Sequence, residues 1–253
     1  MKNALDFTGK VVLVTGGGGG IGRGIAEAFD RCGAQVVVAE IDPVRADATR
    51  SALGKTSRVA VTDVRDSAAV DALLHEVASS YGRLDVLVNN VGDFLGIVKP
   101  LEEYADADFD ALFAVNLRQV FQVTRSSLPL MKQTGSGGSV ISVSSIEAFR
   151  GIPMNVVYSA FKAGITGFTK SLALELGPSG IRVNAIAPET TESEQVKPSA
   201  WIPEQYQEHI ARWIPLGRFG TPADAAGCAL FLASELAGWV TGTTIHLDGG
   251  ALA

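Results

Sequence analysis

The sequence predicts one α/β domain over residues 1–253, built on a doubly wound parallel sheet of about seven strands with helices on both faces. Short β-branched runs recur along the chain and alternate with longer stretches of helical periodicity. Most of these runs are almost continuously apolar, which is typical of strands that are buried on both faces. No linker rich in Pro, Gly or Ser divides the chain, because TGSGGS at 134–139 is long enough only for a loop.

The predicted strands are bounded by turn residues or by the start of a helical pattern. In chain order they cover residues 10–14, 34–40, 58–64, 84–90, 138–145, 181–187 and 244–249. The first helix has one apolar face, and a glycine follows its last turn. The residues that show this pattern are Ile21, Ile25, Ala28, Phe29 and Gly33.

Composition excludes several classes of protein. With 27 acidic and 21 basic residues the net charge is −6, which argues against sequence-independent binding to nucleic acid. Hydrophobic residues make up 47% of the chain, too many for a disordered protein. Cys32 and Cys228 are too few for a disulfide framework or a cysteine-based zinc site, so we expect two buried thiols and no metal.

The N-terminal segment carries no secretory pattern, because its apolar stretch is only VVLV and glycines follow it at once. No stretch approaches the ~20 apolar residues that span a bilayer. We therefore expect a cytoplasmic protein without a membrane partner.

A glycine-rich turn follows the first predicted strand and precedes the first predicted helix. The pattern T-G-x-x-x-G-x-G is formed by Thr15, Gly16, Gly20 and Gly22, with Ile21 inside it. Glycines allow a tight turn and a close approach of the backbone to a ligand, whose phosphates then face the helix N-terminus. A glycine run alone is often only a flexible loop, so the flanking strand and helix are what predict a dinucleotide site.

Glu40 ends the second predicted strand, 18 residues after Gly22. At this place an acidic side chain binds the hydroxyls of the adenosine ribose and repels a 2′-phosphate. Sites for NADP tend to offer Arg or Lys there, whereas this chain has Gly19 and Ile41. The sequence therefore predicts NAD as the cofactor, and the alternative is that Glu40 only marks the end of a strand.

Tyr158 and Lys162 stand four residues apart in a strongly helical pattern and so share one helix face. A free tyrosine has a pKa of about 10 and is a poor base, whereas a nearby cation favours the phenolate. Ser145 ends the fifth predicted strand, thirteen residues before Tyr158, where side chains meet the crevice at the carboxyl edge of the sheet. These three residues are candidates for acid–base chemistry.

Together these motifs resemble those of the short-chain dehydrogenase/reductase family over the whole chain. The glycine pattern, Asp63, NNVG at 89–92, Asn116, Ser145 and Y-x-x-x-K at 158–162 occur in the family's order and spacing. The resemblance implies a Rossmann-type sheet and an alcohol dehydrogenase or ketone reductase. It also implies a homotetramer, with the last strand and the C-terminus at a subunit interface.

The resemblance implies catalytic roles at the matching positions. Tyr158 would be the general acid in reduction and the general base in oxidation, while Ser145 would hold the substrate oxygen. Lys162 would hold the nicotinamide ribose, and Asn116 would complete a proton relay to Lys162 through a water. The alternative for Asn116 is an ordinary polar residue inside a helix.

The resemblance also adds cofactor contacts after the later strands. Asp63 and the Val64 backbone would bind the adenine ring, and the alternative for Asp63 is a helix cap. Asn89, Asn90 and Gly92 would line the cofactor and steady the central strand. The full predicted cofactor site comprises Gly16, Gly20, Ile21, Gly22, Glu40, Ile41, Asp63, Val64, Asn90, Gly92, Tyr158, Lys162, Pro188 and Thr191.

Two positions depart from the family pattern. Val91 stands where the family usually has Ala, and it adds bulk on the nicotinamide side. Glu189 follows Pro188 where the family usually has Gly, so the assignment of the carboxamide ligands to Thr191 and Ser193 is less direct. Neither departure touches the predicted catalytic groups.

The segment 190–219 breaks the alternation of strands and helices, and we expect it to be an insertion that covers the substrate. Apolar residues spaced i, i+4, i+8 and i+11 would form one stripe on a helix starting at Pro203: Ile202, Tyr206, Ile210 and Trp213. The alternative is that this stripe packs on the protein's own core or on another subunit. The predicted substrate pocket comprises Phe94, Glu147, Met154, Asn155, Trp201 and Trp213.

The sequence thus predicts an NAD-dependent oxidoreductase that acts on a secondary alcohol or ketone with an apolar cyclic, aromatic or steroid-like body. The alternatives are a sugar or polyol dehydrogenase and a 3-oxoacyl-type reductase. A non-catalytic NAD-binding regulator on the same fold is a further alternative, although the intact set of Ser145, Tyr158 and Lys162 argues against it.

Overall fold

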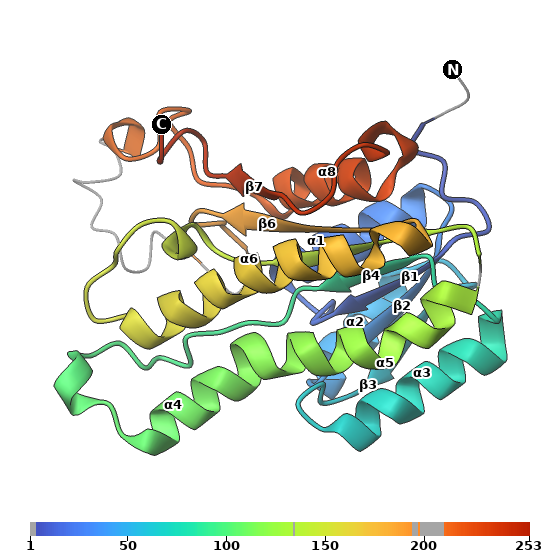
Figure 1. Cartoon of the computed structure of the whole chain (residues 1–253), viewed down its shortest axis with the longest axis horizontal. Coiled ribbons are helices and arrows are strands. Elements are labelled where there is room, and N and C mark those ends of the chain that lie inside the picture. The colour runs from blue at the N-terminus through green and yellow to red at the C-terminus, as the bar shows by residue number, and fades with distance from the viewer. Residues whose placement is uncertain (1–3, 134, 194–196, 198–209) are drawn as a thin grey trace.

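Within the described residues, seven parallel strands form one sheet (Figure 1). The structure is a computed structural model that describes residues 4–133, 135–193, 197 and 210–253. The strands are β1 (Val11–Thr15), β2 (Gln35–Glu40), β3 (Arg58–Val61), β4 (Val86–Asn89), β5 (Gly138–Val143), β6 (Ile181–Pro188) and β7 (Thr244–Leu247). Their order across the sheet is β3-β2-β1-β4-β5-β6-β7, and all neighbours are parallel. The predicted α/β fold is confirmed.

Helices cover both faces of this sheet (Figure 1). One face packs against α3 (Ser67–Tyr81), α5 (Gln119–Gln133) and α6 (Val156–Leu176), and the other against α1 (Gly20–Arg31) and α8 (Pro222–Ala233). The remaining described α-helices are α2 (Pro43–Ala52) and α4 (Asp106–Phe113), and a π-helical turn (Ala114–Arg118) joins α4 to α5. The 3-10 turns are Leu101–Glu103, Ile146–Ala148, Gly177–Ser179, Ile210–Arg212 and Glu235–Ala237.

The inner strands are buried on both faces, as their continuous apolar sequences predicted. The edge strands β3 and β7 are partly exposed instead, because each has a neighbour on one side only. The strand predicted at 58–64 ends early, at Val61. The backbone N–H of Arg65 donates to the Asp63 carboxylate (2.9 Å), and this turn leads the chain away from the sheet.

The strand order places the predicted functional segments at one edge of the sheet. β1 lies between β2 and β4: the chain runs from β1 to β2 and β3 on one side, and then crosses to β4 on the other. Such a change of direction leaves a crevice beyond the carboxyl ends of the strands, where ligands bind in open α/β sheets. The loops after β1, β2, β4, β5 and β6 all meet this crevice.

The predicted insertion at 190–219 is described only in part. Trp201, Ile202 and Tyr206 lie outside the described residues, so the helical stripe is not tested there. At the described end of the stripe, Ile210–Arg212 forms a 3-10 turn and Trp213 is 48% exposed. Its neighbour Ile214 is the residue that packs inward, at 4% exposed.

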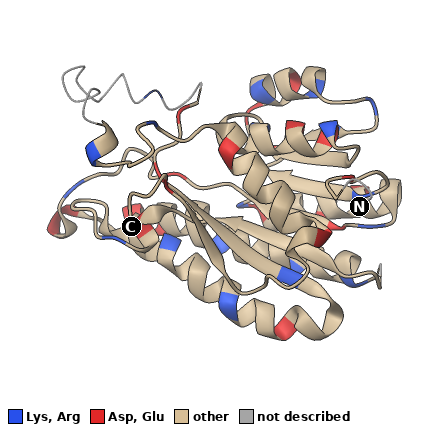
Figure 2. Cartoon of the chain, turned by 90° about the horizontal axis from the view of Figure 1, so that it is seen from above, with Lys and Arg blue, Asp and Glu red and all other residues tan. Residues whose placement is uncertain are grey.

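Acidic and basic residues are mixed along the same helices and loops (Figure 2). In the part of the chain that the structure describes, no helix is long and apolar enough to cross a membrane. Nor do His, Cys, Asp and Glu side chains gather there as metal ligands. Cys32 and Cys228 are free thiols, but they are partly rather than fully buried, which corrects the prediction. Cys32 lies at the C-cap of α1, and both cysteines pack against the apolar core on that face of the sheet.

Candidate active site

The glycine-rich turn between β1 and α1 has a backbone that other residues adopt only with strain. Gly16 has φ +64° and Gly20 has φ +51°, in the left-handed region that favours glycine. A Cβ on Gly22 would collide with the carbonyl oxygen of Gly16. Because α1 begins at Gly20, its free N–H groups face this turn. The turn therefore fits a dinucleotide pyrophosphate, which needs close approach to the backbone.

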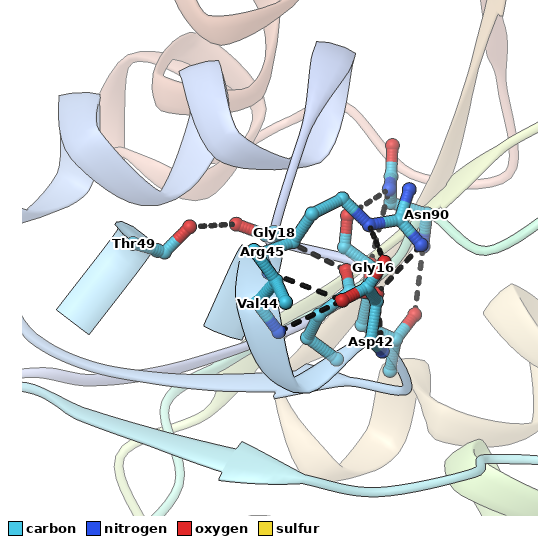
Figure 3. Close-up of polar contacts among 10 residues, drawn as sticks. Gly16, Gly18, Asp42, Val44, Arg45, Thr49 and Asn90 are labelled. Atoms are coloured by element: carbon cyan, nitrogen blue, oxygen red, sulfur yellow. Dashed lines mark hydrogen bonds and ion pairs between the residues drawn. The ribbon is translucent and has the colours of Figure 1, made fainter. Parts of the chain in front are cut away.

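Asn90 joins the glycine-rich turn to the end of β4. Its Nδ2 atom donates to the carbonyl oxygens of Thr15 (3.0 Å) and Gly16 (3.2 Å) (Figure 3). The neighbouring Asn89 is fully buried, and its Nδ2 atom donates to Thr124 Oγ1 on α5 (2.9 Å). Asn90 thus shapes the turn, and Asn89 fixes β4 against the helix that covers it.

Glu40 is buried at the end of β2, and backbone N–H groups hold its carboxylate. Oε2 accepts a hydrogen bond from Gly18 (2.9 Å), and Oε1 accepts one from Asp42 (3.0 Å). Gly18 permits this contact, because a Cβ at that position would collide with the carboxylate. Ile41 beside it is 49% exposed at the rim of the crevice.

A basic residue that was not predicted lies next to Glu40. Arg45 Nη2 lies 3.0 Å from Glu40 Oε1, and Arg45 Nε lies 3.5 Å from Asp42 Oδ2 (Figure 3). Positions 19 and 41 indeed carry no base, but α2 brings one from further along the chain. The available signal was the helix start at Asp42-Pro43, since Asp42 caps α2 and directs its first turn back towards β2.

Asp63 lies after β3 with its carboxylate already paired. It accepts hydrogen bonds from Arg65 Nε (2.9 Å) and Nη2 (2.8 Å), which lower the pKa of Asp63. A bond to an adenine ring would have to share this carboxylate with Arg65. Asp66 rather than Asp63 caps α3, so the alternative interpretation of Asp63 as the helix cap is wrong. Val64 is buried.

Ser145, Tyr158 and Lys162 lie together at the carboxyl end of β5. The Ser145 hydroxyl accepts a hydrogen bond from the Glu147 N–H (3.2 Å), and it lies near enough to Tyr158 to lower the pKa of the phenol. Lys162 is buried (2% exposed), with Nζ 3.0 Å from the Val143 carbonyl oxygen and 5.5 Å from the centre of the Tyr158 ring. Gly92 leaves room for this ammonium, because a Cβ there would collide with Nζ.

Asn116 is fully buried in the π-helical turn. Its Nδ2 atom donates to the carbonyl oxygens of Asp93 (2.7 Å) and Leu112 (3.0 Å), and Oδ1 accepts from the Asp93 N–H (3.1 Å). Its side chain thus fixes the loop after β4, next to Gly92. π-Helical turns within α-helices are frequent at functional sites.

The electrostatics of this group differ from the prediction. Burial raises the pKa of Tyr158 and the Glu147 carboxylate raises it further, against the effect of Ser145, which lowers it. Burial lowers the pKa of Lys162 to about 8, although Asp93 and Glu147 oppose this change. The net pKa of Tyr158 is raised rather than lowered, because burial and the acidic neighbours Glu147 and Asp93 outweigh the effect of Ser145. The phenol therefore keeps its proton at neutral pH.

Glu147 and Asn155, two predicted pocket residues, lie together near Tyr158. Glu147 Oε2 accepts hydrogen bonds from Asn155 Nδ2 (2.8 Å) and Ser159 Oγ (2.9 Å). Burial is the main cause that raises the pKa of Glu147. Among the described residues, Glu147 Oε1 has no hydrogen-bond partner, and Asn155 Oδ1 is buried without one. Each residue thus has an unused acceptor atom.

Glu189, the departure after Pro188, is held by an ion pair. Its Oε2 atom lies 2.5 Å from Arg150 Nη2, and Oε1 accepts a hydrogen bond from the Thr190 N–H (2.8 Å). The Thr191 hydroxyl donates to the Glu189 carbonyl oxygen (3.0 Å). The pair joins the end of β6 to the segment after β5, a link that needs a side chain and that glycine would not provide.

Three of the predicted pocket residues are exposed apolar side chains, and one of them, Phe94, contacts Tyr158. The Phe94 ring is 47% exposed and lies edge-on to the Tyr158 ring, with 6.5 Å between centres. Met154 is also 47% exposed, and its φ of +64° is unusual for a residue with a side chain. Trp213 is half-exposed, and Trp201 lies outside the described residues.

Comparison with known proteins matches residues 16–251 to the family model described as enoyl-(acyl carrier protein) reductase. A 3-oxoacyl-[acyl-carrier-protein] reductase of Thermotoga maritima is 40% identical over 97% of this chain and 99% of its own length. Galactitol 2-dehydrogenase of Agrobacterium fabrum is 34% identical, over 97% of this chain and 98% of its own.

A solved structure has a similar fold over nearly the whole chain. It is a 7α-hydroxysteroid dehydrogenase in complex with NADH and 7-oxo glycochenodeoxycholic acid. Its TM-score is 0.91 with 30% sequence identity, and the match covers 99% of this chain and 97% of that one. The relatives therefore share one chain architecture and differ in the substrates that their names state.

Proposed function

Since this chain belongs to the short-chain dehydrogenase/reductase family and is an oxidoreductase, we propose that it transfers a hydride between NAD and a secondary alcohol or ketone. The observation that carries this proposal is the convergence of Ser145, Tyr158 and the buried Lys162 at the carboxyl end of β5. The glycine-rich turn in the same crevice supports it, because it fits a dinucleotide pyrophosphate.

In this proposal Tyr158 carries the proton. Its raised pKa keeps the phenol protonated, so that it donates to the substrate's carbonyl oxygen during reduction. During oxidation the phenol must first have lost its proton to solvent, and the phenolate oxygen then takes the proton of the substrate hydroxyl. Ser145, beside Tyr158, holds the substrate oxygen at the phenol. The bound cofactor would donate the hydride in its reduced form and accept it in its oxidised form, whose positive ring would also favour the phenolate.

Lys162 balances charge beneath the phenol. With a pKa of about 8 its ammonium is mainly protonated at pH 7, and the Val143 carbonyl fixes its place. A positive charge there stabilises the phenolate that forms when Tyr158 gives up its proton. The roles of Lys162 at the nicotinamide ribose and of Asn116 in a water relay remain predictions from the family.

We expect at least a tenfold preference for NAD over NADP in kcat/KM, which corresponds to about 1.4 kcal/mol. The cause is the Glu40 carboxylate, buried where a 2′-phosphate would lie in this proposal. Steady-state kinetics with each cofactor at one alcohol concentration measures the ratio. Equal efficiency with the two cofactors would refute the assignment of NAD.

We further propose a substrate with an apolar cyclic, aromatic or steroid-like body. Phe94 offers exposed apolar surface beside Tyr158, and Met154 is exposed just before the helix that carries Tyr158. A hydroxysteroid dehydrogenase is among the structural relatives. Cyclic and steroidal alcohols are expected to exceed small polyols in kcat/KM by about tenfold, the gain of burying one or two methylenes. The reduction of NAD, followed by absorbance across such a panel, measures it.

A polyol dehydrogenase is the second candidate. Glu147 Oε1 has an acceptor position that a second substrate hydroxyl could use, and galactitol 2-dehydrogenase is among the relatives. The same panel of alcohols distinguishes the two candidates. A tenfold higher kcat/KM for polyols would mean that Phe94 and Met154 do not bind the substrate. Adding a 3-oxoacyl thioester covers the reductase alternative that the Thermotoga relative represents.

The same panel addresses the regulator alternative. A protein that binds NADH but oxidises or reduces no member of the panel would be a binding module rather than an enzyme. We also propose a homotetramer in solution, which sedimentation analysis of the purified chain tests.

A further inference from the structure

Arg45 is a charged group at the proposed cofactor site that the reaction does not use. Its Nη2 atom pairs with Glu40 Oε1 at 3.0 Å, whereas Nε is buried and makes no hydrogen bond with any described residue. Nε lies 3.5 Å from Asp42 Oδ2, which is an ionic contact without hydrogen-bond geometry. The guanidinium thus keeps donor capacity at the end of β2 (Figure 3).

Glu40 does not need Arg45 to stay in place. Its two oxygens accept backbone hydrogen bonds from Gly18 (2.9 Å) and Asp42 (3.0 Å), which fix the carboxylate from both sides. Glu40 is 3% exposed, whereas the Arg45 side chain is 40% exposed. The carboxylate is therefore the fixed member of the pair, and the arginine is the member that can move.

We propose that Arg45 is a latent ligand for a 2′-phosphate. Its ion pair with Glu40 prevents Arg45 from binding such a phosphate in the native chain. In the native chain the Glu40 carboxylate repels such a phosphate and also occupies the guanidinium that would bind it. Without that carboxylate, Arg45 would present its planar fork of donors, a geometry that matches phosphate oxygens. Asp42 remains a weaker competitor, because its side chain is 42% exposed and screened by solvent.

This inference rests on the proposed binding of the adenosine ribose at Glu40. It differs from relief of repulsion in what it predicts for Glu40→Ala. If Glu40→Ala only relieved the repulsion of the 2′-phosphate, the gain in NADP binding would not depend on Arg45. A latent ligand would make binding of the 2′-phosphate depend on Arg45, and only in the absence of Glu40.

The test is equilibrium binding of NADH and NADPH, followed by fluorescence, together with calorimetry of 2′,5′-ADP against ADP. The variants are Glu40→Ala, Arg45→Ala and the double variant Glu40→Ala/Arg45→Ala. The matched control is Glu40→Ala/Arg50→Ala, because Arg50 lies on the same helix but pairs with Asp47 and not with Glu40. Glu40→Gln, with and without Arg45→Ala, repeats the comparison with the side-chain volume kept.

Glu40→Ala is expected to bind NADPH at least tenfold more tightly than the native chain does. Adding Arg45→Ala should remove most of this gain and leave NADH binding nearly unchanged, whereas adding Arg50→Ala should leave the gain intact. Equal NADPH binding by Glu40→Ala and Glu40→Ala/Arg45→Ala would overturn the inference. If the native chain binds NADPH as well as NADH, the proposed cofactor preference fails, and the comparison of these two variants still decides the role of Arg45.

Discussion

Tyr158→Phe is expected to lose nearly all turnover while binding NADH almost as well as the native chain. The substitution removes only the hydroxyl that gives and takes the proton, and keeps the ring that lies against Phe94. General acid–base groups typically contribute about a hundred- to ten-thousand-fold to the rate. Initial rates with the best alcohol of the panel, and a fluorescence titration with NADH, measure the two quantities.

Tyr81→Phe is the control for this experiment. The Tyr81 hydroxyl donates to the Thr56 carbonyl oxygen (2.9 Å), at the end of α3, away from the carboxyl edge of the sheet. It should keep both turnover and NADH binding. If Tyr158→Phe retained more than roughly a third of the native rate, a group other than this hydroxyl would carry the proton.

Lys162→Met should lose at least about a hundredfold in turnover and should be more stable than the native chain at pH 7. The loss of turnover follows because no cation then stabilises the phenolate form of Tyr158. The gain in stability follows because the native fold holds a buried ammonium, whose pKa burial lowers from 10.5 to about 8. Below pH 8 the folded chain therefore carries a charge that water solvates better, and methionine removes that cost.

The sign of the pH dependence separates this cause from a packing effect. Between pH 8 and 10.5 the unfolded chain binds more protons at Lys162 than the folded chain, so the native protein gains stability as pH rises. The advantage of Lys162→Met should therefore shrink across this window. Chemical unfolding at pH 7 and at higher pH measures it, with Lys170→Met, an exposed lysine on the same helix, as control. A lower stability of Lys162→Met at pH 7 would contradict the account.

Local patterns were enough to predict the frame of the molecule. The inner strands are continuous apolar runs. A short run that is apolar on both faces is typical of a parallel sheet covered by helices on both sides. The glycine-rich turn was predictable because it needs positive φ angles, which glycine adopts readily and other residues do not. Ser145, Tyr158 and Lys162 meet because a strand end and one helix face lie at the same edge of the sheet.

Contacts that depend on the direction of a side chain were not predictable. Arg45 reaches Glu40 only because α2 starts at a particular angle, and the sequence around Glu40 itself shows no base. The raised pKa of Tyr158 depends on burial and on Glu147, which approaches from the segment after β5. A helical spacing indicates that Tyr158 and Lys162 share a face, but it says nothing about the acids that face them.

At Gly92, in the loop after β4, the limit on side-chain size comes from a residue on a distant helix. Its φ angle is not in the left-handed region, so the backbone there would accept any residue. A Cβ there would collide with the Lys162 ammonium and come close to Asn116 Oδ1, both of them side-chain rather than backbone atoms. An alanine at this position would therefore leave the fold intact and displace the charge beneath Tyr158. A survey of variants by melting temperature would count such a change as silent, although its whole effect would lie in the rate.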